Sequence, residues 1–299
     1  MDYKKIIKNQ ETRFTLLNLV KFVPDKIMLK IQYRIKLNRK LNLKNPERYS
    51  EKAQWYKINY RDPLMTKCAD KFSVREYIES KGLKDILVEL YGVYNDPNSI
   101  NLNQLPDKFI VKTTNGSGTN YICTNKNDFD LQKVKQKLNH WMNRNIFSAS
   151  REWAYKNIES KIIIEELIED NENEFSGIND YKIFCFNGKA EYIVVDVDRD
   201  ISHKRNIYTR DWDYINTSTD YPKIEKNVEK PEGLDRMIEI AEKLAQDFPH
   251  VRVDLYWVNN KIYFGELTFY PWTGYIYFSE DQFDYILGEK FVLPKVKRG

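Results

Sequence analysis

The sequence is poor in the residues that build metal centres and disulfide frameworks. Its 299 residues include only three cysteines and three histidines, namely Cys68, Cys123, Cys185, His140, His203 and His250. The cysteines form no CxxC pair, so they predict no disulfide framework and favour a reducing compartment. The histidines lack the spacing of metal ligands, which argues against a zinc enzyme.

Long apolar runs are also missing. No stretch reaches the roughly 18 apolar residues of a membrane span, and residues 1–14 contain no apolar segment or cleavage site of a secretory signal. We therefore expect a cytoplasmic protein. Aromatic residues are abundant instead, with 21 Tyr, 15 Phe and 6 Trp, and hydrophobic residues make up 41% of the chain. This composition is typical of a globular protein with a sizeable core.

The net charge of +4 is unevenly distributed. Residues 1–50 contain 13 Lys and Arg against 4 Asp and Glu, whereas the remainder of the chain has more acidic than basic residues. We place a basic N-terminal arm at residues 1–48. It predicts helix on both sides of Pro24. One interpretation of the arm is a helix that docks on the body and exposes its basic face to solvent. Another is a surface that binds an anionic membrane or a polyanionic glycan. Binding to a membrane would put the protein at its inner face. We expect no nucleic-acid partner, because no recognition motif accompanies the charge.

Hydrophobic periodicity predicts a mixture of helices and hairpins. Helical spacing covers residues 68–81, 128–143 and 231–247, and Gly82 marks the end of the first helix. Strands are predicted within residues 85–94, 109–114, 120–124 and 161–168, and in two hairpins around Asn187-Gly188 and Asn259-Asn260. This order favours an α+β (mixed α/β) fold over a regular βαβ array.

The C-terminal hairpin carries the most informative carboxylates. If its connection comprises the three residues Asn259–Lys261, the register places Asp254 opposite Glu266 and Arg252 opposite Thr268, all on one face. Directly opposed Cβ atoms lie about 4.5–5.5 Å apart, so the carboxylates repel unless a cation neutralises them. Mg²⁺, which accepts carboxylates together with phosphate oxygens, would do so. Alternatively, Arg252 alone neutralises the pair, or a two-residue turn puts the carboxylates on opposite faces.

A lysine and a glycine-rich loop follow each other in the middle of the chain. Lys112 interrupts an apolar run and precedes Asn115, Gly116, Ser117 and Gly118. Glycine lets backbone N–H groups approach a phosphate closely, and the Ser117 hydroxyl adds a donor. The loop is not a Walker A loop, because no Gly-Lys-Ser/Thr occurs. It predicts either a lid over phosphates, with Lys112 reaching underneath, or an ordinary hairpin turn.

Two glutamates end the apolar strand that contains three consecutive isoleucines. A buried strand rarely ends in two carboxylates for packing alone. One explanation for Glu165 and Glu166 is a strand edge that offers backbone groups to adenine and a carboxylate to an exocyclic amine or ribose. The alternative is a strand that emerges into solvent.

Together and in this order, these elements resemble the ATP-grasp superfamily, and most closely its TupA-like branch of polysaccharide-biosynthesis proteins. The resemblance extends from about Tyr49 to Leu293 and is carried by SEKAQWYK, ADKFSVREYI, LPDKFIVKTTNGSG, IIIEELIED, DYKIFCFNGK, VRVDLY and FGELTF. It implies an N-terminal α/β portion over residues 49–107 and two α+β lobes that grip ATP. These are a phosphate-loop lobe over residues 108–168 and a metal-binding lobe over residues 169–294.

The resemblance implies roles for individual residues. Lys71 and Lys112 look like the lysines that bind the nucleotide phosphates, and Gly116, Ser117 and Gly118 look like the mobile phosphate loop. The adenine-binding hinge is implied at Glu165, Glu166, Leu167 and Ile168. Lys182 takes the basic position of an Asp-x-Arg strand found in related amino-acid ligases.

The same resemblance implies a magnesium site. Asp254 and Glu266 look like its ligands, and Arg252 looks like the arginine that steadies a transferring phosphoryl group. Thr268 departs from the pattern, because many members carry Asn at this position. Its hydroxyl would then be the third ligand.

The implied reaction is an ATP-dependent ligation through an acyl phosphate that forms an amide. It would join a uronic-acid carboxylate of a capsular or cell-wall polysaccharide to an amino acid or another amine. Arg199, His203 and Arg205 are candidates for binding a substrate carboxylate, or else solvated hairpin residues. Two other functions stay open. They are a phosphotransferase on a sugar or amino acid, and a non-catalytic domain whose basic arm tethers a polysaccharide-assembly complex.

Overall fold

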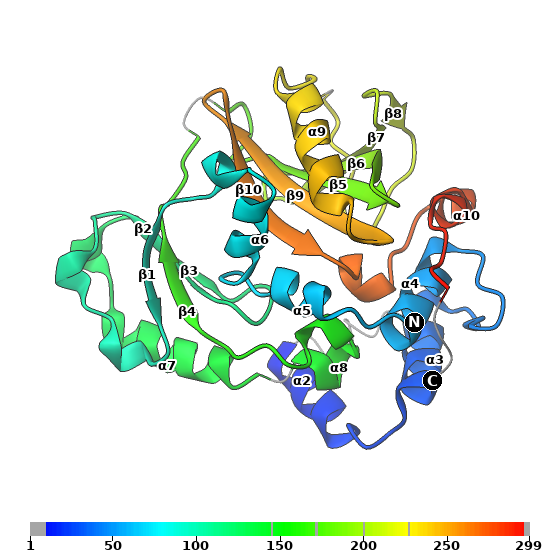
Figure 1. Ribbon diagram of the computed structural model, residues 1–299, viewed down its shortest axis with the longest axis horizontal. Helices are drawn as coiled ribbons and strands as arrows, with labels where there is room; N and C mark the ends of the chain where they lie inside the picture. The colour runs from blue at the N-terminus through cyan, green and yellow to red at the C-terminus, as the bar shows by residue number, and fades with distance from the viewer. Residues whose placement is uncertain (1–9, 145, 171–172, 200, 227, 296–299) are drawn as a thin grey trace.

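A computed structural model describes residues 10–144, 146–170, 173–199, 201–226 and 228–295. Two antiparallel sheets form its framework, with helices between and around them (Figure 1). The helices are α2 (Gln10–Leu19), α3 (Asp25–Leu37), α4 (Tyr49–Asn59), α5 (Pro63–Ala69), α6 (Val74–Ser80), α7 (Leu131–Met142), α8 (Ile146–Ser150), α9 (Leu234–Ala245) and α10 (Asp281–Lys290). The strands are β1 (Leu90–Tyr94), β2 (Phe109–Thr113), β3 (Asn120–Cys123), β4 (Ile162–Glu165), β5 (Asp180–Phe186), β6 (Lys189–Val197), β7 (Lys204–Thr209), β8 (Tyr214–Ile215), β9 (His250–Val258) and β10 (Lys261–Thr268). The α+β class predicted from the sequence is confirmed.

The smaller sheet has the strand order β1-β4-β2-β3 and packs against α7. Ile162 and Ile164 of β4 share a core with Val134 and Leu138 of α7. Strand β4 is central, and its last residue, Glu165, lies opposite both Leu90 and Ile110. The predicted strand edge at Glu165 is therefore wrong, because neighbouring strands pair with β4 on both sides.

The larger sheet has the order β10-β9-β5-β6-β7-β8 and two chemically different faces. Successive side chains of a strand point to opposite faces, so apolar and charged residues separate. Ile183 of β5 and Val253 of β9 lie in the main core with the apolar stripe of α9, which contacts β5, β6 and β9. That stripe, predicted from its helical spacing, is buried throughout: Leu234, Met237, Ile238, Ala241 and Leu244.

The β5–β6 and β9–β10 hairpins of the larger sheet each turn through two residues with positive φ. Asn187 and Gly188 have φ of 50° and 79°, and Asn259 and Asn260 have φ of 50° and 59°. These left-handed conformations suit the tight turn of a twisted hairpin. Since Val258 pairs with Lys261, the predicted three-residue connection is wrong.

A bulge nevertheless restores the predicted pairing of the carboxylates. The register of β10 shifts between Phe264 and Glu266, so Glu266 pairs with Asp254 and Thr268 pairs with Arg252. The extra residue is Gly265, where a Cβ atom would lie 2.9 Å from the carbonyl oxygen of Asp254. Glycine is required here because the two backbones approach closely.

The helix predicted over residues 68–81 is interrupted in its first half. Asp70 Oδ1 accepts hydrogen bonds from the backbone N–H groups of Phe72 at 3.0 Å and Ser73 at 2.6 Å. An aspartate that binds the backbone in this way competes with helix formation, so α5 ends before it and α6 begins after it. The prediction of one continuous helix is wrong. The interruption places Lys71 in a turn, where its N–H donates to Thr114 O at 3.3 Å.

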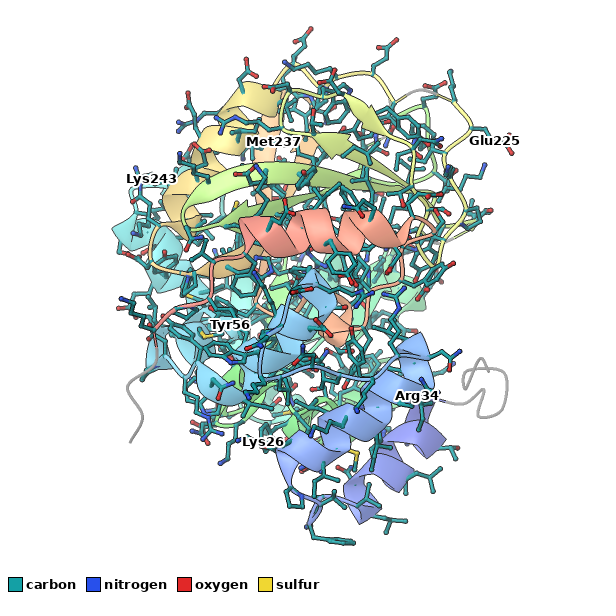
Figure 2. All side chains as sticks on the ribbon, turned by 90° about the vertical axis from the view of Figure 1, so that its right-hand side faces the viewer. Lys26, Arg34, Tyr56, Glu225, Met237 and Lys243 are labelled. Atoms are coloured by element: carbon teal, nitrogen blue, oxygen red, sulfur yellow. The ribbon has the colours of Figure 1, made fainter. Side chains whose placement is uncertain are left out.

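The N-terminal helix α3 is packed into the body. Leu29 and Tyr33 are fully buried, with Leu41 and Tyr275 in the same core. The buried Gln32 donates to Ala149 O at 3.2 Å and accepts from the Tyr275 hydroxyl at 2.6 Å. Figure 2 shows α2 and α3 at the lower end of the molecule, away from the larger sheet. No helix within the described residues is long and apolar enough to cross a membrane.

Candidate functional site

A row of buried charges crosses the larger sheet on the face opposite to its apolar core. The register places Lys182 of β5 opposite Asp254 of β9, and Asp180 opposite Asp196 of β6. Lys182 Nζ lies 3.0 Å from Asp254 Oδ2 and also contacts Asp180. All four side chains are buried. Buried charges are costly unless they are paired, so this row depends on its mutual contacts.

Arg252 binds both carboxylates of the predicted metal pair. Its Nε and Nη2 donate to the two oxygens of Asp254 at 2.6 Å each, and Nη2 also donates to Glu266 Oε1 at 3.2 Å. The Thr268 hydroxyl accepts from Arg252 at 3.1 Å and donates to Glu266 Oε1 at 3.0 Å. The predicted face therefore exists, and on it Arg252 neutralises the opposed carboxylates, which was the alternative explanation for their pairing.

The pKa values of the two carboxylates are shifted in opposite directions. Burial alone would raise the pKa of Glu266, but Lys71, Arg252 and Lys182 outweigh burial and lower the pKa to about 2. For Asp254, which is more deeply buried, desolvation prevails over the same kind of attraction, and its pKa is raised. The Glu266 side chain is 35% exposed. It is therefore the accessible member of the pair, and its surroundings favour its charged form.

The oxygen donors of this cluster fit a magnesium ion that is shared with a phosphate. Asp254, Glu266 and Thr268 offer the hard oxygen ligands that Mg²⁺ prefers. Within the described part of the chain no donor contacts Glu266 Oε2, so lone pairs remain on that carboxylate. The described residues include no group of three or more His, Cys, Asp or Glu side chains around one point. A cation here would therefore need phosphate or water oxygens to complete its coordination.

Two predicted phosphate lysines converge between the sheets. A small pocket is lined by Lys71, Arg75, Leu87, Val88, Lys112, Glu165, Phe264 and Gly265, which come from both lobes. Lys112 Nζ lies 2.9 Å from Glu165 Oε2, and Arg75 Nη1 lies 3.0 Å from Glu165 Oε1. Burial lowers the pKa of Lys71, and repulsion by Lys112 acts in the same direction. Three cations around one carboxylate leave an excess of positive charge that suits a phosphate group.

The glycine loop and the hinge border this pocket. Lys71 Nζ donates to the Gly116 carbonyl, and Ser117 and Gly118 are exposed at the tip of the loop, with φ of 68° at Gly118. Glu166, Leu167 and Ile168 are half-buried and lead from β4 towards the larger sheet. The Glu165 carboxylate, which the resemblance assigns to the adenine hinge, instead contacts Lys112 and Arg75.

The three candidate substrate residues join the charged row. Arg205 Nη2 donates to Asp196 Oδ2 at 2.7 Å, and His203 Nε2 lies 3.2 Å from Asp196 Oδ1. Arg199 Nη1 donates to Asp180 Oδ2 at 2.7 Å and its side chain is 48% exposed. Burial opposes ionisation of Asp196, but the nearby His203 ring and the Arg205 guanidinium outweigh it and hold the pKa far below its usual value. Arg205 is buried, so its interpretation as a solvated hairpin residue is wrong.

Sequence reasoning missed the aromatic side chain that lies over these arginines. The Trp272 ring centroid lies 4.5 Å from the guanidinium carbon of Arg205 and 5.3 Å from that of Arg252. Trp272 and Thr273 have φ of 48° and 54°, a strained conformation for such residues. Lys57 Nζ holds this turn by donating to Thr273 O at 2.8 Å. The Pro-Trp-Thr-Gly segment signals a turn but not this cation–π contact.

Sequence reasoning also left three charged residues of the site without a role. Asp180 and Asp196 contact Lys182, and Arg75 binds Glu165 in the pocket. Asp180 is the Asp of the Asp-x-Arg pattern that drew attention to Lys182, so a local signal for it existed. Asp196 and Arg75 have partners that are distant in sequence, and no local pattern indicates them.

Two antiparallel lobes that enclose a cationic pocket and a carboxylate pair define a fold of the ATP-grasp class. The model of the TupA-like ATP-grasp family matches residues 51–292, and the chain belongs to this family. It is therefore a member of the ATP-grasp superfamily. No match is found among curated proteins.

Several solved structures of ligases resemble the chain at low sequence identity. D-alanine–D-alanine ligase from Bacillus anthracis, complexed with ATP, is 14% identical with a TM-score of 0.39, over 67% of this chain and 53% of that one. The Helicobacter pylori enzyme is 16% identical with a TM-score of 0.42, over 82% and 69%. Phosphoribosylamine–glycine ligase from Thermotoga maritima is 13% identical with a TM-score of 0.43, over 69% and 48%. The chain thus spans little more than half the length of the Bacillus anthracis ligase.

Proposed function

We propose that this protein is an ATP-dependent ligase that activates a carboxylate as an acyl phosphate and joins it to an amine. Beside family membership, one observation supports the proposal. Lys71 binds the carbonyl of the glycine loop and interacts electrostatically with Glu266, so the phosphate pocket and the carboxylate pair form one continuous site. A nucleotide whose phosphates lie on Lys71 and Lys112 would present its terminal phosphate to Arg252 and Glu266.

Each residue has a role that follows from its chemistry. Lys71 and Lys112 would bind the phosphate oxygens, and the backbone N–H groups of residues 116–118 would close over them. Arg252 is buried and remains charged, because the attraction of Asp254 and Glu266 outweighs the effect of burial on its pKa. It would stabilise negative charge on the transferring phosphoryl group. Asp254, Glu266 and Thr268 would hold Mg²⁺, which neutralises charge on the phosphates.

The reaction balances without a covalent enzyme intermediate. A substrate carboxylate oxygen bonds to the γ-phosphorus of ATP while the bond to the leaving ADP breaks. The amine nitrogen then attacks the acyl carbon, phosphate leaves, and the nitrogen loses a proton to give the amide. For the acid we propose a uronic-acid residue of a capsular or cell-wall polysaccharide or its precursor. The half-exposed Arg199, at the outer end of the charged row, supports an anionic substrate.

The test counts products with ATP, Mg²⁺ and a panel of uronic acids and amines. The proposal expects ADP, phosphate and amide in equal amounts. A phosphorylated sugar without free phosphate would instead identify a phosphotransferase. Absence of both turnover and any thermal shift with Mg²⁺-ATP would identify a binding domain. Lys112→Met serves as the control, because it removes a phosphate ligand and keeps a side chain of similar length, so no cavity is left.

A further inference from the structure

Exposed apolar side chains gather at the N-terminal end of the described chain. Six of the twelve exposed large hydrophobic side chains in the described residues lie within residues 16–35, and Phe22, at 79%, is the most exposed. They are Leu16, Leu19, Phe22, Ile27, Ile31 and Ile35. Single exposed apolar residues are normal, but a cluster marks an interaction surface.

The outer face of α3 carries two parallel rows of side chains. Ile27, Ile31 and Ile35 recur every four residues and are exposed, and Lys26, Lys30 and Arg34 recur beside them with the same spacing. Residues four apart lie on one side of a helix, so an apolar row adjoins a basic row. Figure 2 labels Lys26 and Arg34 near the two ends of this helix. An apolar stripe flanked by basic residues is the pattern of a helix that lies on an anionic membrane.

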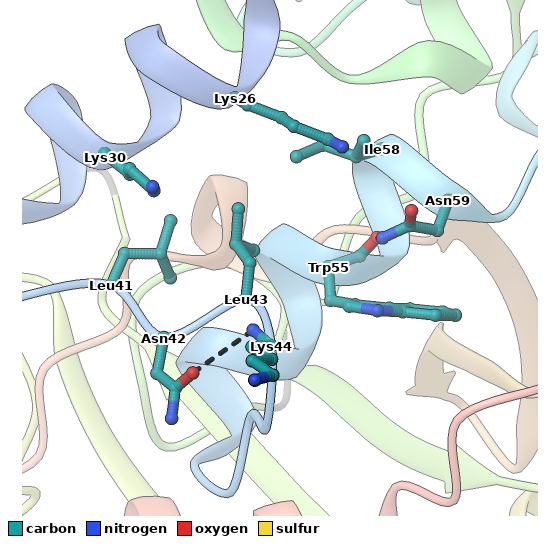
Figure 3. Close-up of a pocket in the computed structure, with 9 residues that line it drawn as sticks. All are labelled: Lys26, Lys30, Leu41, Asn42, Leu43, Lys44, Trp55, Ile58 and Asn59. Carbon is teal, nitrogen blue, oxygen red and sulfur yellow. Dashed lines mark hydrogen bonds between the residues drawn. The ribbon is translucent and has the colours of Figure 1, made fainter.

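A pocket opens beside the basic row. Figure 3 shows the Lys26 side chain of α3 extending towards Ile58 of α4, and Lys30 pointing towards the segment that carries Leu41 and Lys44. Among the described residues, no carboxylate lies within ion-pair distance of Lys26, Lys30 or Lys44. Three unpaired ammonium groups around one opening suit a phosphate group.

The body of the protein holds this surface in place. Arg151, which is buried, donates from Nη1 to Lys21 O at 3.2 Å and from Nη2 to Val20 O at 3.1 Å, and its Nη1 lies 3.2 Å from Asp25 Oδ1. These contacts fix the turn between α2 and α3 that presents Phe22. The exposed apolar residues therefore belong to a preformed surface.

We propose that α2, α3 and their connecting turn dock on an anionic membrane surface. The apolar side chains enter the lipid headgroup region, and Lys26, Lys30 and Lys44 bind lipid phosphates. A soluble polyanion would satisfy the lysines but leave Phe22 and the isoleucine row in water. A second copy of the chain would bring two strongly basic segments together, and like charges disfavour that contact. Charge complementarity thus favours the lipid surface.

The test measures binding of the full chain to vesicles by flotation. Vesicles of phosphatidylcholine alone are compared with vesicles that also contain phosphatidylglycerol, at about 0.1 M and about 0.5 M salt. Binding is expected only to the anionic vesicles, and weaker at high salt. Lys26→Glu with Lys30→Glu should weaken it by more than about tenfold, since each basic residue near the surface contributes about fivefold. Phe22→Ser with Ile31→Asn should weaken it without a change in charge.

Matched controls separate this surface from general electrostatics. Lys84→Glu with Lys133→Glu makes the same charge change at exposed lysines elsewhere, and Ile201→Asn removes an equally exposed apolar residue. Both controls should retain binding. Equal losses in the control and the α3 variants would overturn the proposal. Vesicle binding that is unchanged in Phe22→Ser with Ile31→Asn, but is displaced by a soluble acidic glycan, would also overturn it. A concentration-dependent dimer that the α3 variants abolish would do the same. Thermal unfolding without nucleotide, measured on every variant, shows whether folding is intact and does not depend on ATP binding or on the outcome with vesicles.

Discussion

Asp254 and Glu266 lie directly opposite each other across β9 and β10, although the two-residue turn that joins these strands would offset them by one residue. The extra residue at Gly265 corrects the offset and puts both carboxylates on the face of Arg252. The β5–β6 hairpin contains a similar irregularity. Its register shifts between Phe184 and Cys185, and this shift brings Asp180 opposite Asp196. Two bulges thus assemble the charged row of the site.

The bulge at Gly265 is open to direct test. In Gly265→Ala the added Cβ would meet Asp254 O at 2.9 Å and the Tyr256 ring at 3.2 Å. We expect a loss of about 1–3 kcal/mol in the free energy of unfolding, and a smaller thermal shift with Mg²⁺-ATP because Glu266 moves. Urea unfolding of Ser176→Ala is the control, since the Ser176 side chain is exposed. Equal effects of the two substitutions would mean that the bulge tolerates a side chain.

Glu266→Gln should destabilise the protein in the absence of nucleotide. Opposed carboxylates alone would repel, but Lys71, Arg252 and Lys182 surround Glu266 and favour its charge. We expect a loss on the order of 1 kcal/mol, because the carboxylate is partly exposed, together with loss of the Mg²⁺-dependent part of the ATP thermal shift. Glu169→Gln, at an exposed pair with Lys108, is the control. If the variant keeps the full Mg²⁺-dependent shift, Glu266 is only a partner of Arg252 and not a metal ligand.

Acid should weaken the fold through the same residue. The pKa of Glu266 in the folded protein is about 2, below the value of about 4.3 for an unfolded chain. The folded state therefore binds fewer protons, and the stabilisation is complete above about pH 4.3 and is lost as the pH falls towards 2. Asp196, whose pKa is also lowered, likewise makes the folded state less stable as the pH falls. Asp254, whose pKa is raised, has the opposite effect on stability. The free energy of unfolding, measured between about pH 5 and 2, should fall less steeply in Glu266→Gln than in wild type. Parallel curves would contradict the assignment.

Lys112→Met should weaken ATP binding while the fold is kept. The substitution removes one of three cations that line the pocket, and Arg75 still neutralises Glu165. We expect the Kd for ATP to rise on the order of tenfold or more, as for loss of a charged phosphate contact. Titration calorimetry measures it, with Lys108→Met as the control, because Lys108 is exposed and paired with Glu169. An unchanged Kd in a folded variant would remove Lys112 from the phosphate site.

The sequence by itself determined the elements whose signals are local. Helix α9 follows from its apolar spacing, and the hairpin of β5 and β6 follows from Asn187-Gly188, because periodicity and turn chemistry act over a few residues. The motifs around Lys112, Glu165 and Asp254 were sufficient to identify the family, because the order of motifs along the chain is a property of the sequence. The concentration of basic residues before residue 50 is likewise evident from the sequence alone.

The tertiary structure alone decided how these pieces meet. No turn rule predicts the bulge at Gly265, because its place depends on how the whole sheet packs. Nor does any local pattern place Trp272 over Arg205 and Arg252, or turn the buried Tyr33 inwards and Ile31 outwards on α3. These relations join residues from distant strands and helices. Their energies arise from burial and charge pairing, and these forces act only once the chain has folded.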